Sequence, residues 1–107
     1  TQIQEISPQT LKARLDQGED IAIIDVREPH EYAIANIGGA LIPHKQVGEH
    51  THKIPQDKPV VVHCKSGVRS AKAIRELQDE HGYDNLLNLK GGILAWADVI
   101  EPELQRY

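Results

Sequence analysis

A short run of β-branched residues that ends at the chain's single cysteine sets the strongest limit on the fold. Residues 60–62 are all valine, His63 follows, and Cys64 stands where the apolar run stops. A polar loop comes next, and a helical pattern begins at Ser70. A continuously apolar strand that leads through a short loop into a helix is typical of a parallel sheet covered on both faces. This arrangement aims backbone N–H groups and a helix N-terminus at the thiol of Cys64.

The rest of the chain alternates strand and helix patterns in the same way. Residues 21–26 form a second continuously apolar run and predict another buried strand. A polar stretch, residues 44–58, predicts a loop with one helical turn. The remaining patterns predict short strands at 3–6, 37–42 and 86–89, and helices from Ser7-Pro8 to Gly18 and at 28–35, 70–81 and 93–99. The sequence therefore predicts an α/β fold with a mostly parallel central sheet, helices on both faces, and a ligand site at the carboxyl ends of the strands.

Length and composition indicate a single domain and exclude several classes of protein. A chain of 107 residues fits a single domain, residues 1–107, and the lack of methionine even at position 1 fits a piece of a longer protein. A net charge of −4 argues against nucleic acid as a partner. No apolar run is long enough to cross a membrane, so we expect a soluble, cytoplasmic protein with no membrane partner. One cysteine excludes an internal disulfide and suits a reducing compartment.

The loop after the second long strand carries the predicted chemistry. A helix N-terminus with nearby cations lowers a thiol pKa from about 8.5 into the range of roughly 3.5 to 7.5, so Cys64 is the predicted nucleophile. Lys65 and Arg69 add positive charge, Gly67 supplies a backbone with positive φ, and Ser70 is predicted to cap the next helix. The predicted substrate-binding segment is Lys65, Ser66, Gly67, Val68, Arg69 and Ser70.

Other polar and aromatic residues have structural interpretations. His44, His50 and His52 lack the regular spacing of metal ligands and are expected to be exposed loop residues. Asp25 and Arg27 are expected to form a structural ion pair at the end of a strand. Trp96 is expected to belong to the core. The sequence therefore predicts no metal site and no cofactor.

The chain resembles the rhodanese (sulfurtransferase) domains over nearly its whole length. The segments that carry the resemblance are Asp25-Val26-Arg27-Glu28-Pro29-His30-Glu31-Tyr32, Ile37-Gly38-Gly39-Ala40, Val62-His63-Cys64-Lys65-Ser66-Gly67-Val68-Arg69-Ser70, and Lys90-Gly91-Gly92 with Trp96. The end of the chain looks like the rhodanese domain fused to adenylyltransferases of the molybdopterin, thiamine or tRNA-thiolation pathways. The resemblance implies that Cys64 carries sulfane sulfur as a persulfide. It implies a sulfur donor, thiosulfate or a cysteine desulfurase, and as acceptor a thiophile such as cyanide, another thiol or a ubiquitin-like sulfur-carrier protein.

One departure from the family pattern and two alternative functions accompany this interpretation. Ala35-Asn36 stands where the family usually has Gly-His, so a proton-transfer role at that position is doubtful, although asparagine preserves hydrogen bonding. A phosphatase or arsenate reductase on the same fold needs five residues between cysteine and arginine, and here Arg69 arrives one place early. A non-catalytic rhodanese-like binding module typically lacks the cysteine.

Overall fold

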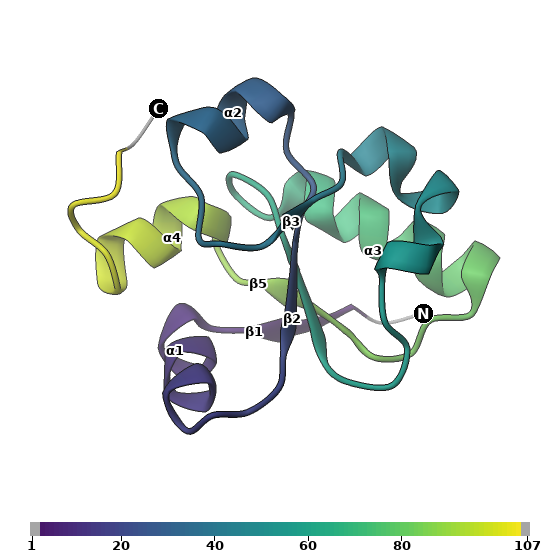
Figure 1. The fold of residues 1–107 in the computed structure, drawn as a ribbon, viewed down its shortest axis with the longest axis horizontal. Helices are drawn as coiled ribbons and strands as arrows, with labels where there is room; N and C mark the ends of the chain where they lie inside the picture. Colours follow the sequence, from purple (N-terminus) through teal and green to yellow (C-terminus); the bar gives the residue numbers. More distant parts are fainter. Residues whose placement is uncertain (1–2, 106–107) are drawn as a thin grey trace.

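The computed structural model describes residues 3–105 and is built on one parallel sheet. Its strands are β1 (Gln4–Ile6), β2 (Ala22–Asp25), β3 (Ala40–Leu41), β4 (Val60–His63) and β5 (Leu86–Leu89), in the spatial order β1-β5-β4-β2-β3 (Figure 1). Every strand pair is parallel. The strand that precedes Cys64 is the middle one, so the carboxyl ends of its neighbours β2 and β5 flank the cysteine.

Helices cover both faces of this sheet. They are α1 (Pro8–Asp16), α2 (Pro29–Ile34), α3 (Val68–His81) and α4 (Gly92–Val99), with two short 3-10 helices, η1 (His44–Glu49) and η2 (Thr51–Lys53). Helices α1 and α4 contact each other, and α3 contacts η1 on the other side of the sheet. Figure 1 shows α2 lying over the end of the sheet to which the strands β2 and β3 run. The α/β fold with a parallel sheet and helices on both faces is therefore confirmed.

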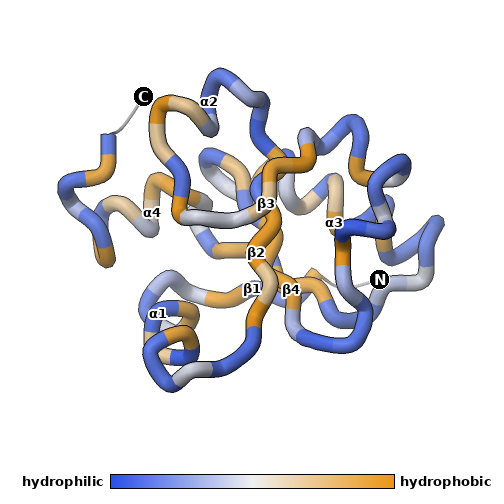
Figure 2. Tube along the Cα trace, in the orientation of Figure 1, coloured by the Kyte–Doolittle hydropathy of each residue, from blue (hydrophilic) through white to orange (hydrophobic). Residues whose placement is uncertain are grey.

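Alternation along β4 explains why its first three residues are all valine. Val60 and Val62 belong to the core cluster on the α3 side, together with Ile74 and Leu77. Val61 belongs to the cluster on the other side, together with Leu11, Leu89 and Trp96. Because both sides of this central parallel strand are covered, an apolar side chain is favoured at each of these three positions. Figure 2 shows this hydrophobic stretch through the middle of the molecule.

Helix ends follow the local signals of the sequence. The Ser7 hydroxyl accepts a hydrogen bond from the backbone N–H of Thr10 at 3.1 Å and caps α1. Gly18, which follows α1, has a φ of 81°, and Gly82, which ends α3, has a φ of 71°. Both take the left-handed backbone conformation that favours glycine after a helix. The polar stretch from 44 to 58 contains two 3-10 helices where the sequence predicted a single helical turn.

The predicted capping role of Ser70 is wrong. Helix α3 begins at Val68, and its N-cap is Gly67, which has a φ of 108°. Since Gly67 turns the chain into the helix earlier than predicted, Ser70 is the third helical residue, and its side chain is fully buried. Among residues 3–105, no helix is both long enough and apolar enough to span a membrane.

Candidate active site around Cys64

The Cys64 thiol lies in a cradle made by the loop that follows β4. Cys64 is only 1% exposed. The backbone N–H of Gly67 donates a hydrogen bond to the Cys64 Sγ at 3.0 Å, and the Ser70 Oγ lies 3.5 Å from the same sulfur. The positive φ of Gly67 curls the loop so that its amides face the sulfur, as the sequence predicted.

This cradle favours the ionised form of the cysteine. Burial raises the pKa of the Cys64 thiol, because it removes the charged form from water. The Ser70 hydroxyl and the backbone N–H groups of Ser70, Gly67 and Ser66 oppose burial by hydrogen bonding to the thiolate, and together they bring the pKa below its ordinary value. The first turn of α3 adds the positive end of a helix dipole. The cradle therefore favours a thiolate at Cys64.

Asn88 of β5 completes the inner side of the cradle. Its side-chain Nδ2 donates to the backbone carbonyl of Gly67 at 3.2 Å, and its Oδ1 accepts from the Ser70 Oγ at 2.6 Å. Asn88 is 4% exposed and Ser70 is fully buried, so water does not compete for these bonds. A strand next to β4 thus fixes both the turn at Gly67 and the hydroxyl beside the sulfur.

The N-terminus of α4 holds the other side of the loop. The backbone N–H groups of Ile93 and Leu94 donate to the carbonyls of Cys64 at 2.9 Å and Lys65 at 3.2 Å. Gly92 has a φ of 62°, and a Cβ added there would overlap the Lys65 carbonyl. These bonds fix the carbonyls of Cys64 and Lys65 at the start of α4. The Gly91-Gly92 pair is therefore part of the site architecture.

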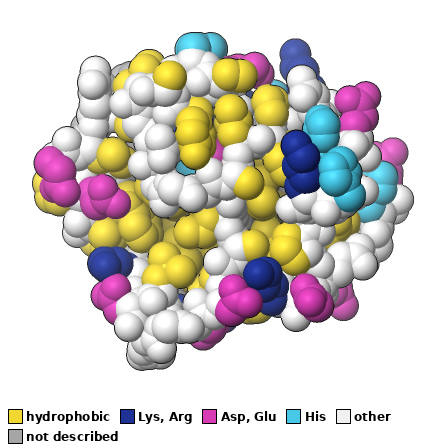
Figure 3. Space-filling model, in the orientation of Figure 1, with side chains coloured by type: hydrophobic (Ala, Val, Ile, Leu, Met, Phe, Trp, Pro, Cys, Tyr) yellow, Lys and Arg dark blue, Asp and Glu magenta, His cyan; other side chains and the backbone are white. Residues whose placement is uncertain are grey.

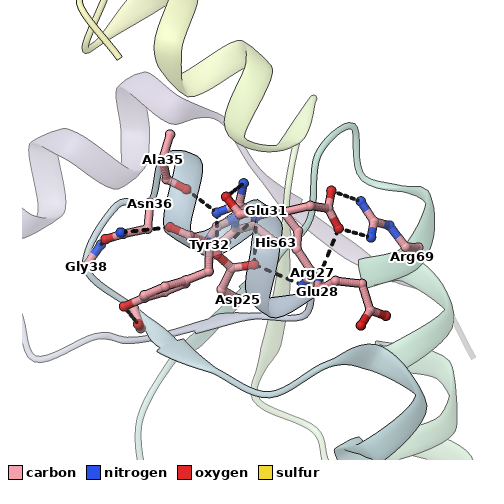
Figure 4. A network of polar contacts seen from close by, with 11 residues as sticks. Asp25, Arg27, Glu28, Glu31, Tyr32, Ala35, Asn36, Gly38, His63 and Arg69 are labelled. Atoms are coloured by element: carbon pink, nitrogen blue, oxygen red, sulfur yellow. Dashed lines mark hydrogen bonds and ion pairs between the residues drawn. The ribbon is translucent and has the colours of Figure 1, made fainter. Parts of the chain in front are cut away.

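Arg69 is held by a carboxylate of α2. Its Nη1 and Nη2 donate to the Glu31 Oε1 and Oε2 at 2.6 and 2.8 Å. The Glu31 Oε1 also accepts the backbone N–H of Glu28 at 3.0 Å, which closes the capping box of α2. Glu31 is 7% exposed. The guanidinium thus has a fixed position between the loop and α2 (Figure 4).

A buried ion pair anchors α2 to the sheet. The Arg27 Nε and Nη2 donate to the Asp25 carboxylate at 2.9 and 2.6 Å, and both side chains are fully buried. The same Nη2 donates to the carbonyl of Ala35 at the end of α2 at 2.6 Å. Figure 4 shows this network beside the Glu31–Arg69 pair. The structural role expected for Asp25 and Arg27 is confirmed.

His63 lies at the edge of this network, next to Asp25 (Figure 4). It is fully buried, and its Nε2 is 3.9 Å from the Asp25 Oδ2. Neither ring nitrogen has a hydrogen-bond partner among the described residues. Burial lowers the pKa of His63 and outweighs the opposing effect of the Asp25 charge, so the ring is neutral.

The remaining loop residues lie on the outer side of the cradle. Lys65 is half-buried, Ser66 is exposed, and Val68 is 62% exposed. Asn36 does preserve local hydrogen bonding: its Nδ2 donates to the Tyr32 carbonyl at 3.2 Å, and its Oδ1 accepts the backbone N–H of Gly38 at 3.0 Å.

The histidines at positions 44, 50 and 52 lie in and between the two 3-10 helices. Figure 3 shows histidine side chains gathered on one side of the molecule, over the 3-10 helices. His52 is exposed, whereas His44 and His50 are half-buried, so the expectation that these histidines are exposed is confirmed only for His52. Within residues 3–105, no three His, Cys, Asp or Glu side chains come together as a metal site.

Three residues of the cradle were not assigned to the site from sequence. Asn88 is the only polar residue in the strand Leu86–Leu89, and a polar residue in an otherwise apolar strand is the sequence signal that could have indicated its role. Glu31 is a buried acid in a short helix; its place in the capping box of α2 is a local signal, but its contact with Arg69 is tertiary. Gly92 was predicted as part of a turn, but its contact with Lys65 joins segments that are far apart in the sequence.

Comparison with known sequences places the chain among rhodanese-like domains and sulfurtransferases. The profile of the rhodanese-like domain family matches residues 7–99. A probable adenylyltransferase/sulfurtransferase, MoeZ from Mycobacterium tuberculosis, is 43% identical over 105 residues, which cover 95% of this chain and 26% of MoeZ. A sulfurtransferase from Allochromatium vinosum is 39% identical over 106 residues and matches over 94% of this chain and 98% of its own length. The chain thus spans about a quarter of MoeZ and almost all of the second relative.

Solved structures show the same fold. A rhodanese-related protein from Thermoplasma volcanium superimposes with a TM-score of 0.78 at 29% identity, over 89% of this chain and 91% of that one. A rhodanese-like domain protein from Staphylococcus aureus gives a TM-score of 0.79 at 29% identity, over 88% and 91% of the two chains.

Proposed function

Because the chain belongs to the rhodanese-like domain family, we propose that it is a sulfurtransferase that carries sulfane sulfur as a persulfide on Cys64. The observation that supports this most directly is the buried sulfur with the Gly67 N–H at 3.0 Å and the Ser70 hydroxyl at 3.5 Å. These donors, with the N-terminus of α3, stabilise negative charge on the thiolate and on the persulfide anion.

The transfer takes place in two displacements. The Cys64 thiolate attacks the outer sulfur of the donor, a new S–S bond forms, and the donor's own bond to that sulfur breaks. The leaving group takes the electron pair, as sulfite when the donor is thiosulfate or as a thiolate when it is a protein persulfide. A thiophilic acceptor then attacks the outer sulfur of the Cys64 persulfide and restores the thiolate.

The partners proposed for this reaction are those implied by the resemblance to rhodanese domains, and the names of two relatives support part of them. The name of MoeZ describes an adenylyltransferase/sulfurtransferase. A second relative, YrkF of Bacillus subtilis, is named as a putative sulfur carrier protein and is 32% identical over 100 residues. These names support a fused adenylyltransferase domain and a ubiquitin-like sulfur carrier as acceptor. The cysteine desulfurase proposed as donor rests on the family resemblance alone. The proposed compartment is the cytoplasm.

A phosphatase or arsenate reductase is less well supported. Four residues separate Cys64 from Arg69. A phosphate-handling loop needs five residues between the cysteine and the arginine, so Arg69 arrives one place too early.

Intact-mass measurement tests the proposal. After incubation with thiosulfate, the protein is expected to gain the mass of one sulfur atom, and cyanide is expected to remove it as thiocyanate. Cys64→Ala is expected to fold, by circular dichroism, and to gain nothing. His52→Ala, a change on the exposed η2, serves as control and is expected to load normally. Sulfur loading of Cys64→Ala, or rapid hydrolysis of an aryl phosphate by a protein that accepts no sulfur, would overturn the proposal.

A further inference from the structure

The Ser70 hydroxyl has one proton and lies between two groups that can accept it. Its Oγ is 2.6 Å from the Asn88 Oδ1 and 3.5 Å from the Cys64 Sγ. Ser70 is fully buried and Asn88 nearly so. Since solvent is excluded, the hydroxyl can satisfy only one of the two acceptors at a time.

The orientation of Asn88 is fixed by a second bond. Its Nδ2 donates to the Gly67 carbonyl at 3.2 Å, and a carbonyl can only accept. The amide oxygen must therefore face Ser70, and because that oxygen can only accept, the Ser70 hydroxyl donates to it. The lone pairs of the Ser70 Oγ then point away from Asn88, and the thiol proton of Cys64 can be donated to them.

A neutral thiol and an ionised sulfur place opposite demands on this hydroxyl. With a neutral thiol, a chain runs from the Cys64 S–H to the Ser70 Oγ and from the Ser70 O–H to the Asn88 Oδ1, and every group has a partner. An ionised sulfur has no proton to donate and needs donors. The Ser70 hydroxyl must then rotate toward the sulfur, which leaves the Asn88 Oδ1 without the donor at 2.6 Å.

We propose that Asn88 is a positioning residue for Cys64, one that takes the Ser70 proton while the sulfur is a neutral thiol and releases it when the sulfur becomes a thiolate or a persulfide anion. No covalent bond of Ser70 or Asn88 changes; the hydroxyl rotates, and the thiol proton goes to solvent. The inference rests on the proposed role of Cys64 as the nucleophile. Its test follows the ionisation of the thiol and needs no sulfur transfer, so the two proposals can fail separately.

The elements packed around the loop carry several charged or titratable groups. They are His63 on β4, Lys65 in the loop, Arg69 on α3 with Glu31 on α2, Asp25 and Arg27 at the end of β2, and Lys90 after β5. The first turn of α4, residues 92–95, carries no charged side chain. Variants of Asn88 and Ser70 leave all these groups in place, so a double-mutant cycle cancels their contributions.

The experiment measures the pKa of Cys64 from the pH dependence of thiolate absorbance and of alkylation by iodoacetamide. Asn88→Leu keeps the side-chain size and removes the acceptor, so the Ser70 hydroxyl becomes free for the thiolate. The pKa is expected to fall by about half a unit to one unit, which raises the alkylation rate at low pH about three- to tenfold. In a Ser70→Ala background, the same substitution is expected to lose at least half of this effect.

Asn88→Asp is the matched control. It also removes the N–H that binds the Gly67 carbonyl, but its carboxylate still holds the Ser70 proton and repels the thiolate, so the pKa is expected to rise. A loop that was merely loosened would shift the pKa in the same direction in both variants. Two results would overturn the inference. One is a shift of the Cys64 pKa in the same direction in Asn88→Leu and Asn88→Asp. The other is an Asn88→Leu shift that keeps more than half of its size in the Ser70→Ala background. If Asn88→Leu did not fold, the test would use Asn88→Asp alone. Its shift of the Cys64 pKa is expected to be smaller in the Ser70→Ala background than with Ser70 present, and equal shifts would overturn the inference.

Discussion

Arg69 in the first turn of α3 forms a bidentate ion pair with Glu31 of α2, 38 residues earlier in the chain. The pair joins the loop around Cys64 to the helix that follows β2. Since α2 is itself anchored by the buried Asp25–Arg27 pair, the guanidinium beside the active loop has a position determined by three separate segments. The ion pair with Glu31 therefore fixes the guanidinium beside the loop that holds Cys64.

The first prediction concerns the choice of sulfur donor. Arg69→Ala is expected to reduce kcat/KM for thiosulfate by about ten- to a thousandfold, the scale of losing one charged donor in a reacting site. A protein persulfide spreads its binding over an interface and should be affected less. Steady-state kinetics with both donors measure the difference. Equal losses with both would show instead that Arg69 serves the Cys64 thiolate.

The second prediction concerns the buried pair under α2. Asp25→Asn leaves the fully buried Arg27 without its counter-charge, so the free energy of unfolding is expected to fall by about 3–5 kcal/mol. Asp16→Asn breaks the exposed Lys12–Asp16 pair of α1 and is expected to cost only about 0.3–0.5 kcal/mol. Urea unfolding measures both. Similar costs for the two variants would contradict the role given to Asp25.

The third prediction concerns the contact between α4 and the active loop. Gly92→Ala requires a positive φ and places a Cβ into the Lys65 carbonyl, so it is expected to lower both stability and sulfur loading. Gly18→Ala shares the positive φ but has no atom within 4 Å of the added Cβ. This control is expected to lose about 1–2 kcal/mol of stability and to load sulfur normally. Normal loading by Gly92→Ala would show that α4 does not hold the loop.

The fourth prediction concerns pH and stability. Burial lowers the pKa of His63 in the folded state, so below about pH 6.5 the unfolded chain binds a proton that the folded protein does not. The free energy of unfolding is therefore expected to decrease as pH falls from about 6.5 toward the folded pKa, with a limiting slope of about 1.4 kcal/mol per pH unit from this group. Urea unfolding at a series of pH values checks it. His63→Gln should flatten the slope and His52→Gln should preserve it; equal slopes in all three proteins would contradict the assignment.

Much of the fold could be predicted because its signals are local. The valine run at 60–62 indicates that both faces of β4 are covered. The structure places Val60 and Val62 on one side and Val61 on the other. Ser7 before Pro8 reports a helix start, because its hydroxyl binds an amide three residues away. Gly67 stands just before a helical pattern, and this position indicates a turn that directs the Gly67 N–H toward the Cys64 sulfur.

The sequence by itself determined the parallel α/β fold, the place of Cys64 at the end of the central strand, and the curled loop around it, because these depend on burial periodicity and backbone conformation within a few residues. Only the tertiary structure decided what the side chains of that loop contact. Ser70 was predicted as a cap and instead lies between the sulfur and Asn88, and Arg69 binds Glu31. These partners come from β5 and α2, and a contact between distant segments leaves no period or local motif in the sequence. It arises when parallel strands bring their carboxyl ends to one edge of the sheet.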